Sequence, residues 1–161
     1  RQLVKNSLRM RPDRIIVGEV RGAEALDMLQ AMNTGHEGSL TTVHANDTRD
    51  ALARLEMMVA MSGFDLPLPV IRQYIANGIG IILHVSRLKG GQRCITKVSE
   101  IVSLNSQGDY KVEDIFGFEQ TGIDDQGNAQ GKFYATGYRP ACLKRMESSG
   151  IKLSQQIFEK K

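Results

Sequence analysis

The chain has 161 residues, of which 41% are hydrophobic and 24% are charged, as is ordinary for a soluble globular protein with a sizeable core. The formal net charge is +3, and the basic residues are scattered without interleaved aromatic residues, which argues against a nucleic-acid-binding stripe. The two cysteines, Cys94 and Cys142, lack metal-ligand spacing and are expected to be reduced thiols of a cytosolic protein. No apolar run is long enough to cross a bilayer.

The first part of the chain alternates helical and strand patterns. Residues 1–10 have the pattern of a helix already under way, since no capping residue precedes them, and we expect the chain to be a fragment of a longer protein. A β-branched run at residues 13–17 predicts a short buried parallel strand, and residues 39–43 predict a second short strand. Apolar residues at helical spacing predict a helix between the two strands, at residues 24–34.

Two more helices are predicted before the pattern changes. Residues 46–48 are all good helix N-caps, and the apolar stripe after them predicts a helix that Gly63 closes. Methionines at helical spacing in this helix are expected to fill gaps in the core. Pro69 can open the next helix, which we expect to run through Asn77.

Strand patterns dominate the second part of the chain. Residues 79–87 and 93–104 predict a hairpin, because a Gly-Gly turn joins them. Residues 110–118 and 132–136 are further strand candidates, separated by a polar loop, and a last helix is predicted at residues 140–149. The patterns together predict an α/β core with an appended β-rich region.

Each of the first two predicted strands ends in a polar residue capable of chemistry, Glu19 after the first and His44 after the second. A single helical crossover makes such strands parallel and, as a rule, neighbouring, so both side chains are expected at the ligand-binding carboxyl edge of the sheet. A carboxylate there can hold Mg²⁺ through water or orient a water toward a terminal phosphate, and an imidazole can hydrogen-bond that phosphate. An apolar strand followed by Glu is weak evidence by itself, because buried strands often end in a charged surface residue.

Two longer motifs strengthen this interpretation. Residues 8–21, LRMRPDRIIVGEVR, closely resemble the Walker B region of the secretion ATPase superfamily, whose members drive type II secretion, type IV pili, type IV secretion and archaella. Residues 34–46, TGHEGSLTTVHAN, resemble the histidine box of the same superfamily, at the right distance downstream. The tail, with ATGYRP at residues 135–140, GIKL at residues 150–153, and Phe158, is similar to the C-terminus of the Flp/Tad (CpaF-like) pilus ATPases.

The resemblance implies a fold and a domain organisation. Residues 1–104 correspond to the C-terminal half of a RecA-like P-loop NTPase core, and residues 105–161 to a family-specific tail that is β-rich and helical. It also implies ATP and Mg²⁺ as ligands. No Gly-x-x-x-x-Gly-Lys-Ser/Thr sequence is present, however, so the main phosphate cradle is absent and the chain alone is expected to turn over negligible ATP.

Functional residues follow from the matching motif positions. The resemblance implies that Glu19 is the Walker B glutamate and the catalytic carboxylate, and that His44 is the histidine-box residue that approaches the terminal phosphate, with His36 as its second member. Gly18 occupies the position at which many P-loop enzymes have an Asp that coordinates Mg²⁺ indirectly. Three arginines flank the site and are candidates for a trans-acting finger or an interface clamp, although surface arginines beside a strand more often do neither: Arg9, Arg11 and Arg21.

No direct metal ligand is assigned. His84 lies in an apolar run without a second His or Cys at metal spacing, and it is expected to be a hydrogen-bonded core or edge-strand residue.

The resemblance implies a homo-hexameric motor at the cytoplasmic face of the inner membrane, where ATP hydrolysis drives a platform protein of a pilus or secretion system. A second hypothesis keeps the RecA-like fold but makes the chain a motor that acts on DNA, as in conjugation, against which the dispersed charge argues. A third is a non-catalytic interaction module whose tail after Asn105 docks a partner, which holds if the gene encodes only this piece.

Overall fold

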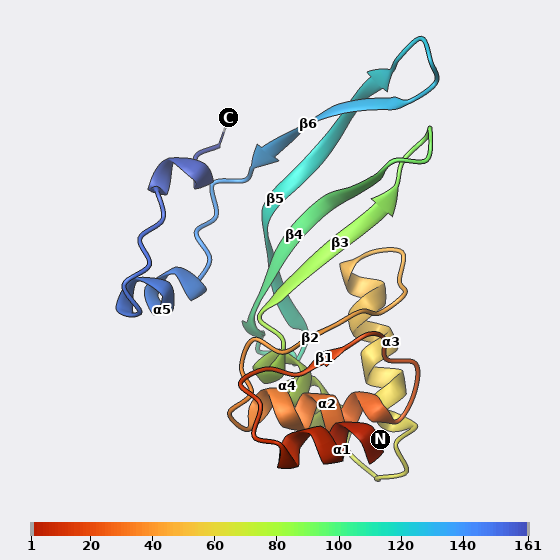
Figure 1. Ribbon diagram of the computed structural model, residues 1–161, viewed down its shortest axis with the longest axis vertical. Helices are drawn as coiled ribbons and strands as arrows, with labels where there is room; N and C mark the ends of the chain where they lie inside the picture. Colours follow the sequence, from red (N-terminus) through yellow and green to blue (C-terminus); the bar gives the residue numbers. More distant parts are fainter. Residues whose placement is uncertain (1, 161) are drawn as a thin grey trace. The chain divides into compact units, whose positions relative to one another are not determined.

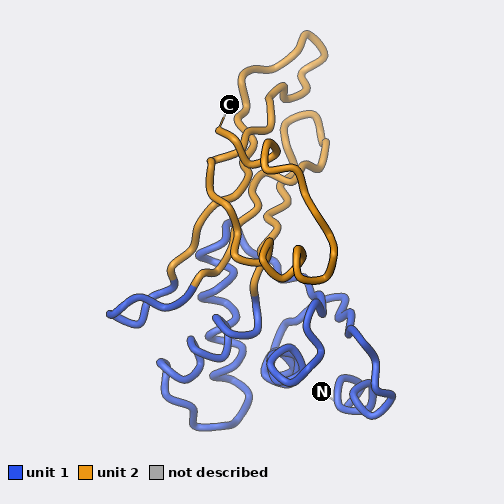
Figure 2. Tube along the Cα trace, turned by 90° about the vertical axis from the view of Figure 1, so that its left-hand side faces the viewer, with its two compact units in different colours: residues 1–79, 103–110 blue, residues 80–102, 111–161 orange. Residues whose placement is uncertain are grey.

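The computed structural model describes residues 2–160, which form an α/β protein of two compact units (Figure 1, Figure 2). Unit 1 holds the chain up to residue 79 together with residues 103–110, and unit 2 holds residues 80–102 and the chain from residue 111 onward. The residues of each unit contact one another more than they contact the other unit. The expected division into an ATPase core at residues 1–104 and a tail at residues 105–161 stays a prediction. No helix within residues 2–160 is both long enough and apolar enough to span a membrane.

Unit 1 contains the helices and short strands that its sequence pattern predicts. Its helices are α1 (Gln2–Arg9), α2 (Glu24–Asn33), α3 (Thr48–Ala60) and α4 (Leu68–Gly78), and its strands are β1 (Ile16–Val17) and β2 (Leu40–Thr41) (Figure 1). Asp47 caps α3, since its Oδ1 accepts a hydrogen bond from the Asp50 backbone N–H at 2.8 Å. The helix predictions are confirmed with small differences at the ends, and Arg1 lies outside the described residues.

The core of unit 1 lies where α2, α3 and α4 pack against one another. Leu29, Val59 and Ile75, one from each of these helices, have no exposed surface. Burying such a side chain completely stabilises the folded state by about 1.5–3 kcal/mol relative to leaving it exposed, so these three contribute strongly to the packing of the unit.

The expectation that Met57, Met58 and Met61, in α3 and at its C-cap, fill gaps in the core is wrong for two of the three. Met58 is 3% exposed and belongs to the core, but Met57 and Met61 are 54% and 66% exposed. Positions four apart lie on the same face of a helix, and α3 buries the opposite face, which carries Leu55 and Val59. Met57 and Met61 therefore form part of the surface of the described chain.

Strands β1 and β2 pair in parallel, with Ile16 opposite Leu40 and Val17 opposite Thr41. This confirms the predicted parallel pair. The expected burial of the first strand is wrong for Ile16, which is 76% exposed, as Leu40 is at 61%. Successive strand residues face opposite sides of a sheet, and Ile15, next to Ile16, is only 9% exposed. One face of the two-stranded sheet is therefore covered, and residues 2–160 leave the side chains of Ile16 and Leu40 on the other face largely exposed.

Unit 2 is built on an antiparallel sheet. Its strands, in the order β3-β4-β5-β6, are β3 (Ile81–Arg87), β4 (Arg93–Leu104), β5 (Tyr110–Ile123) and β6 (Ala129–Ala135). The short helix α5 (Cys142–Ser148) and the 3-10 turn η1 (Gln155–Phe158) follow the sheet (Figure 1). The last residues of β4 and the first of β5 belong to unit 1.

The register of unit 2 confirms the predicted β3–β4 hairpin, with Leu83 opposite Val98. His84 has the hydrogen-bond partner that was expected for it, Thr96, with Nδ1 and Oγ1 3.0 Å apart. The β5–β6 pair is longer than predicted: β5 continues to Ile123, which pairs with Ala129. The mostly polar residues at the end of β5 have no strand pattern in the sequence. They are in a strand because they pair with β6.

The C-terminal segment packs on the sheet of unit 2 through a small apolar cluster of Ile115, Leu143 and Phe158. The rings of Phe116 and Phe158 stack with their centroids 5.6 Å apart. Phe158 lies in η1, which the sequence pattern did not predict, since one short turn carries no periodicity.

Candidate functional site

The crossover from β1 through α2 to β2 brings Glu19 and His44 into contact. Glu19 follows β1 and His44 follows β2, and because the strands are parallel both residues lie at the carboxyl end of the pair. Glu19 Oε1 lies 3.0 Å from His44 Nε2, and Glu19 Oε2 lies 2.7 Å from Arg21 Nη2. The predicted convergence of Glu19 and His44 is confirmed, and Arg21 joins them.

Both oxygens of the Glu19 carboxylate are thus engaged by nitrogen groups. The hydrogen bond from Arg21 is the largest effect on the pKa of Glu19 and lowers it below its ordinary value. Burial opposes this shift, and the charges of Arg21, His44 and Arg54 add to it. The Glu19 side chain is 24% exposed, whereas those of Arg21 and His44 are 78% and 79% exposed. A partly shielded, ionised carboxylate therefore lies between two exposed nitrogen groups.

Turn residues after β1 fix the path of the chain at Arg21. The Glu24 carboxylate accepts hydrogen bonds from the backbone N–H groups of Arg21 and Gly22, at 2.7 and 3.1 Å. These bonds lower the pKa of Glu24, so it stays ionised and holds the turn. Acidic residues in the first turn of a helix are a known sequence signal, but that signal does not say which backbone groups such a residue will bind.

Gly18 immediately precedes Glu19 and has open space on its side-chain side, because a Cβ atom placed there would meet nothing within 4 Å. Within residues 2–160, no three His, Cys, Asp or Glu side chains are grouped so as to hold a metal ion. A single carboxylate can bind a hydrated Mg²⁺ through water, because the ion keeps most of its waters and takes its remaining ligands from a nucleotide. The residues present fit an indirect role for Glu19 in magnesium binding.

The other predicted site residues lie at the opposite end of the strand pair. Arg9 and Arg11 precede β1, and His36 precedes β2, so all three are on the amino-terminal side of the parallel strands. The His36 carbonyl accepts from the Ser39 hydroxyl at 2.7 Å, and no described residue pairs with its buried Nδ1. In the described part of the chain, Arg21 and His44 contact the Glu19 carboxylate, and Arg9, Arg11 and His36 do not.

Arg54 is a residue that sequence reasoning missed. It lies on α3, and its charge helps to lower the pKa of Glu19. An arginine on the exposed face of a helix carries no signal of its own, because only the tertiary packing of α3 brings its charge near the end of β1.

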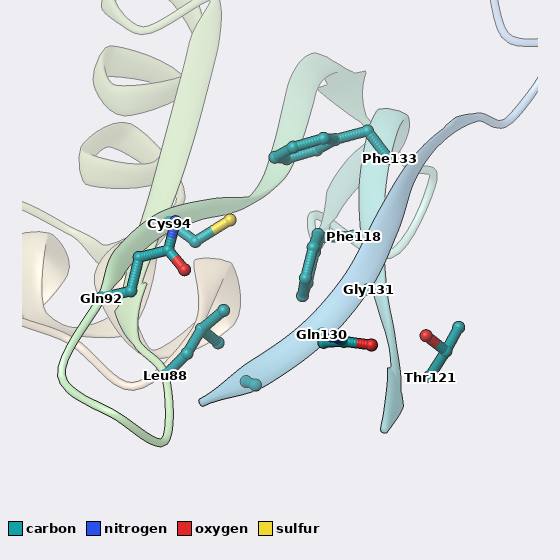
Figure 3. A pocket seen from close by; sticks show the side chains of 9 residues that line it. Leu88, Gln92, Cys94, Phe118, Thr121, Gln130, Gly131 and Phe133 are labelled. Carbon is teal, nitrogen blue, oxygen red and sulfur yellow. The ribbon is translucent and has the colours of Figure 1, made fainter. Parts of the chain in front are cut away.

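Unit 2 has a separate pocket of about 390 Å³ (Figure 3). Strands β4, β5 and β6 line it, with Cys94, Phe118 and Phe133 among the side chains that surround it. The two rings are tilted against each other with centroids 5.2 Å apart. None of the predicted site residues lines this pocket, so it is not part of the Glu19 site.

Comparisons with known proteins agree with the motifs around Glu19 and His44. The sequence family described as "Type II/IV secretion system protein" matches residues 1–110. "Putative conjugal transfer protein Rv3659c" of Mycobacterium tuberculosis is 48% identical over 99 residues, which are 62% of this chain and 28% of that protein. "Type IV secretion system protein VirB11" of Bartonella henselae is 36% identical over 119 residues, which are 73% of this chain and 31% of that protein.

A solved structure supports the same relationship at the level of the fold. The crystal structure of the VirB11 ATPase from the Brucella suis type IV secretion system, in complex with sulphate, matches with a TM-score of 0.56 and 35% sequence identity. The match covers 60% of this chain and 31% of that one. The chain thus spans about a third of the length of the relatives that it matches.

Proposed function

Because the chain belongs to the family of type II/IV secretion system proteins, we propose that it is the C-terminal part of an ATP-hydrolysing motor subunit. The observation that carries this proposal is the contact of Glu19 with His44 and Arg21 at the carboxyl end of β1 and β2. A carboxylate and two phosphate-binding side chains at this edge are what phosphoryl transfer to water needs.

Each residue has a distinct role in the proposed reaction. Glu19 orients the attacking water and accepts its proton, and its lowered pKa keeps it ionised at neutral pH. His44 donates a hydrogen bond to the terminal phosphate, and Arg21 offsets the charge that develops there. Both are largely exposed, so they can turn from Glu19 toward the phosphate when a nucleotide binds. Glu19 would hold Mg²⁺ through water, and the ion would neutralise further charge on the phosphates.

The phosphate cradle has to come from another part of the whole protein, since the chain has no P-loop sequence. Backbone N–H groups and a lysine of such a loop bind the β- and γ-phosphates, and the residues after β1 and β2 complete the site. Glu19 then contributes to turnover rather than to nucleotide affinity.

The test is Glu19→Gln in the whole protein that contains this segment together with a P-loop. We expect ATP hydrolysis to fall by about a hundredfold or more, because the amide cannot accept the proton. Binding of a fluorescent ATP analogue should stay within about twofold of the wild type, since the cradle holds the phosphates. Glu147→Gln, at an exposed position of α5, is the matched control. A Glu19→Gln protein that hydrolyses ATP at the wild-type rate contradicts the proposal.

We propose further that the subunits form a homo-hexamer at the cytoplasmic face of the inner membrane and drive a platform protein of a Flp/Tad-type pilus. The tail motifs at residues 135–140 and 150–153 support this branch, since they lie outside the segment that the secretion family matches. Co-purification of the whole protein with the platform protein of a Flp/Tad pilus from the same organism tests the assignment. Failure to bind it, with binding to a type IV secretion channel instead, contradicts the pilus branch.

A conjugation motor is the second candidate. The names of several relatives favour it, among them "Conjugal transfer protein TrbB" of Rhizobium radiobacter, which is 42% identical over 103 residues. A motor that acts directly on DNA should bind single strands with an affinity that falls steeply with salt, and its ATPase should be stimulated by them. Lack of both effects excludes direct action on DNA.

A further inference from the structure

Thr42, the residue directly after β2, bonds the backbone on both sides of Glu19. The Thr42 hydroxyl donates a hydrogen bond to the Gly18 carbonyl, with 2.6 Å between Oγ1 and O. The Thr42 carbonyl accepts one from the Val20 backbone N–H, at 3.2 Å. Gly18 and Val20 are the two chain neighbours of Glu19, so both peptide units that flank Glu19 are bonded to Thr42.

These bonds occur where regular strand pairing stops. The paired residues of β1 and β2 end at Val17 and Thr41, and Glu19 lies beyond them. The bonds of Thr42 to Gly18 and Val20 continue the connection between the two segments over this stretch.

Thr42 also precedes His44 by a single intervening residue. The residue that fixes the backbone of Glu19 therefore lies on the same short segment as the imidazole that Glu19 contacts. The contact of Glu19 Oε1 with His44 Nε2, at 3.0 Å, thus lies next to this connection and to the pairing of β1 and β2.

We propose that Thr42 is a positioning residue for ATP hydrolysis, which holds Glu19 in the orientation required for catalysis through the hydrogen bond from its hydroxyl to the Gly18 carbonyl. This inference rests on the proposed function. It assigns no contact of Thr42 with the nucleotide. The hydroxyl acts only through Glu19, so its removal affects the rate of the chemical step and leaves nucleotide binding in place.

The chain supplies a matched control in the neighbouring threonine. Thr41 Oγ1 is buried and has no hydrogen-bond partner among the described residues. Thr41→Val removes a hydroxyl that bonds nothing, whereas Thr42→Val removes one that bonds Gly18 and keeps the branched shape. Thr42→Ser keeps the hydroxyl and removes only a methyl group. The three variants separate the hydrogen bond from effects of shape and burial.

The experiment measures steady-state ATP hydrolysis by the whole protein. We expect Thr42→Val to lower kcat by about tenfold or more, with KM for ATP within about twofold, because a small displacement of a catalytic group has a large effect on rate. Thr42→Ser should restore most of the activity, and Thr41→Val should match the wild type. Equal losses in Thr42→Ser and Thr42→Val, or a rise in KM without loss of kcat, overturn the proposal.

The double variant Glu19→Gln with Thr42→Val tests whether Thr42 acts through Glu19. If it does, the second change causes no further loss once Glu19 is replaced, so the two effects are not additive. Additive losses overturn the inference. If Glu19→Gln alone keeps the wild-type rate, the proposed function fails; if Glu19→Gln stops hydrolysis and Thr42→Val does not slow it, only the role of Thr42 fails.

Discussion

Glu19 and His44 are far apart in the chain, yet their side chains meet with 3.0 Å between Oε1 and Nε2. The contact follows from the chain topology, because each residue comes just after one of two parallel neighbouring strands. Arg21 completes the cluster from the opposite side of the same carboxylate. The arrangement leads to predictions on activity, pH dependence and stability.

Replacing Arg21 should shift the pH dependence of hydrolysis. The hydrogen bond from Arg21 is the largest cause of the lowered pKa of Glu19, so Arg21→Ala should move this pKa up toward its ordinary value. The proposed role of Glu19 requires its ionised form, and kcat/KM reports the free protein, in which Arg21 bonds Glu19. The acid limb of the kcat/KM–pH profile should therefore move to higher pH. Arg139→Ala, in unit 2, is the control. An unchanged acid limb in Arg21→Ala contradicts this role for the ion pair.

Replacing His44 should slow the reaction without unfolding the protein. His44 is 79% exposed, so His44→Ala removes little packing, but it removes the imidazole that we expect to contact the terminal phosphate. Loss of one such hydrogen-bond donor lowers kcat by about a hundredfold in comparable sites. His84→Ala is the control, since His84 bonds Thr96 in unit 2. A wild-type kcat in His44→Ala, measured at saturating ATP, excludes this role for the imidazole.

The sequence predicts the local elements of this protein well. Helices α2 and α3 were found from caps and apolar periodicity, and the β3–β4 hairpin from its Gly-Gly turn, because these signals lie within the segments that they describe. The end of β5 near Ile123 and the turn that buries Phe158 were missed, since partners far away in the chain determine them. Exposure of Met57 was missed because periodicity does not say how many faces of a helix are covered.

Part of the candidate site could be predicted, because it too depends on local signals. The ends of two strands and the single crossover between them suffice to predict that Glu19 and His44 lie close together. Thr42 and Arg54 have no sequence pattern that marks them as site residues. The role of Thr42 depends on the nearby Gly18 carbonyl, and that of Arg54 depends on how α3 packs. The roles assigned to His36, Arg9 and Arg11 stay predictions, and these residues lie at the other end of the strands.

The chain by itself should bind ATP weakly and hydrolyse it at a negligible rate. Its 161 residues include the proposed water-orienting carboxylate but no P-loop to hold the β- and γ-phosphates. A sensitive phosphate-release assay on the purified chain checks this, with Glu19→Gln as the control for contaminating activity. Substantial hydrolysis that disappears in Glu19→Gln would show that another part of this chain cradles the phosphates.

Tyr138 should stabilise unit 2 in a pH-dependent way. Glu100 is 5% exposed and accepts hydrogen bonds from the Tyr138 hydroxyl at 2.7 Å and from the Ala141 backbone N–H at 2.9 Å. Burial, and then the hydrogen bond to Glu100, raises the pKa of Tyr138 to about 12. The folded pKa is above the ordinary value of about 10, so the stabilisation is complete below pH 10 and is lost as the pH rises to 12.

Tyr138→Phe tests this directly. Near pH 7 the variant should lose about 1–2 kcal/mol of unfolding free energy in urea, because a buried carboxylate loses one of its donors. Between pH 10 and 12 the wild type should lose stability faster than the variant, since only the wild type has the Tyr138 phenol, whose ionisation is suppressed by folding. Tyr134→Phe is the control, because Tyr134 is 42% exposed. Parallel stability curves for the wild type and Tyr138→Phe across this range would mean that the Tyr138–Glu100 bond does not stabilise the fold.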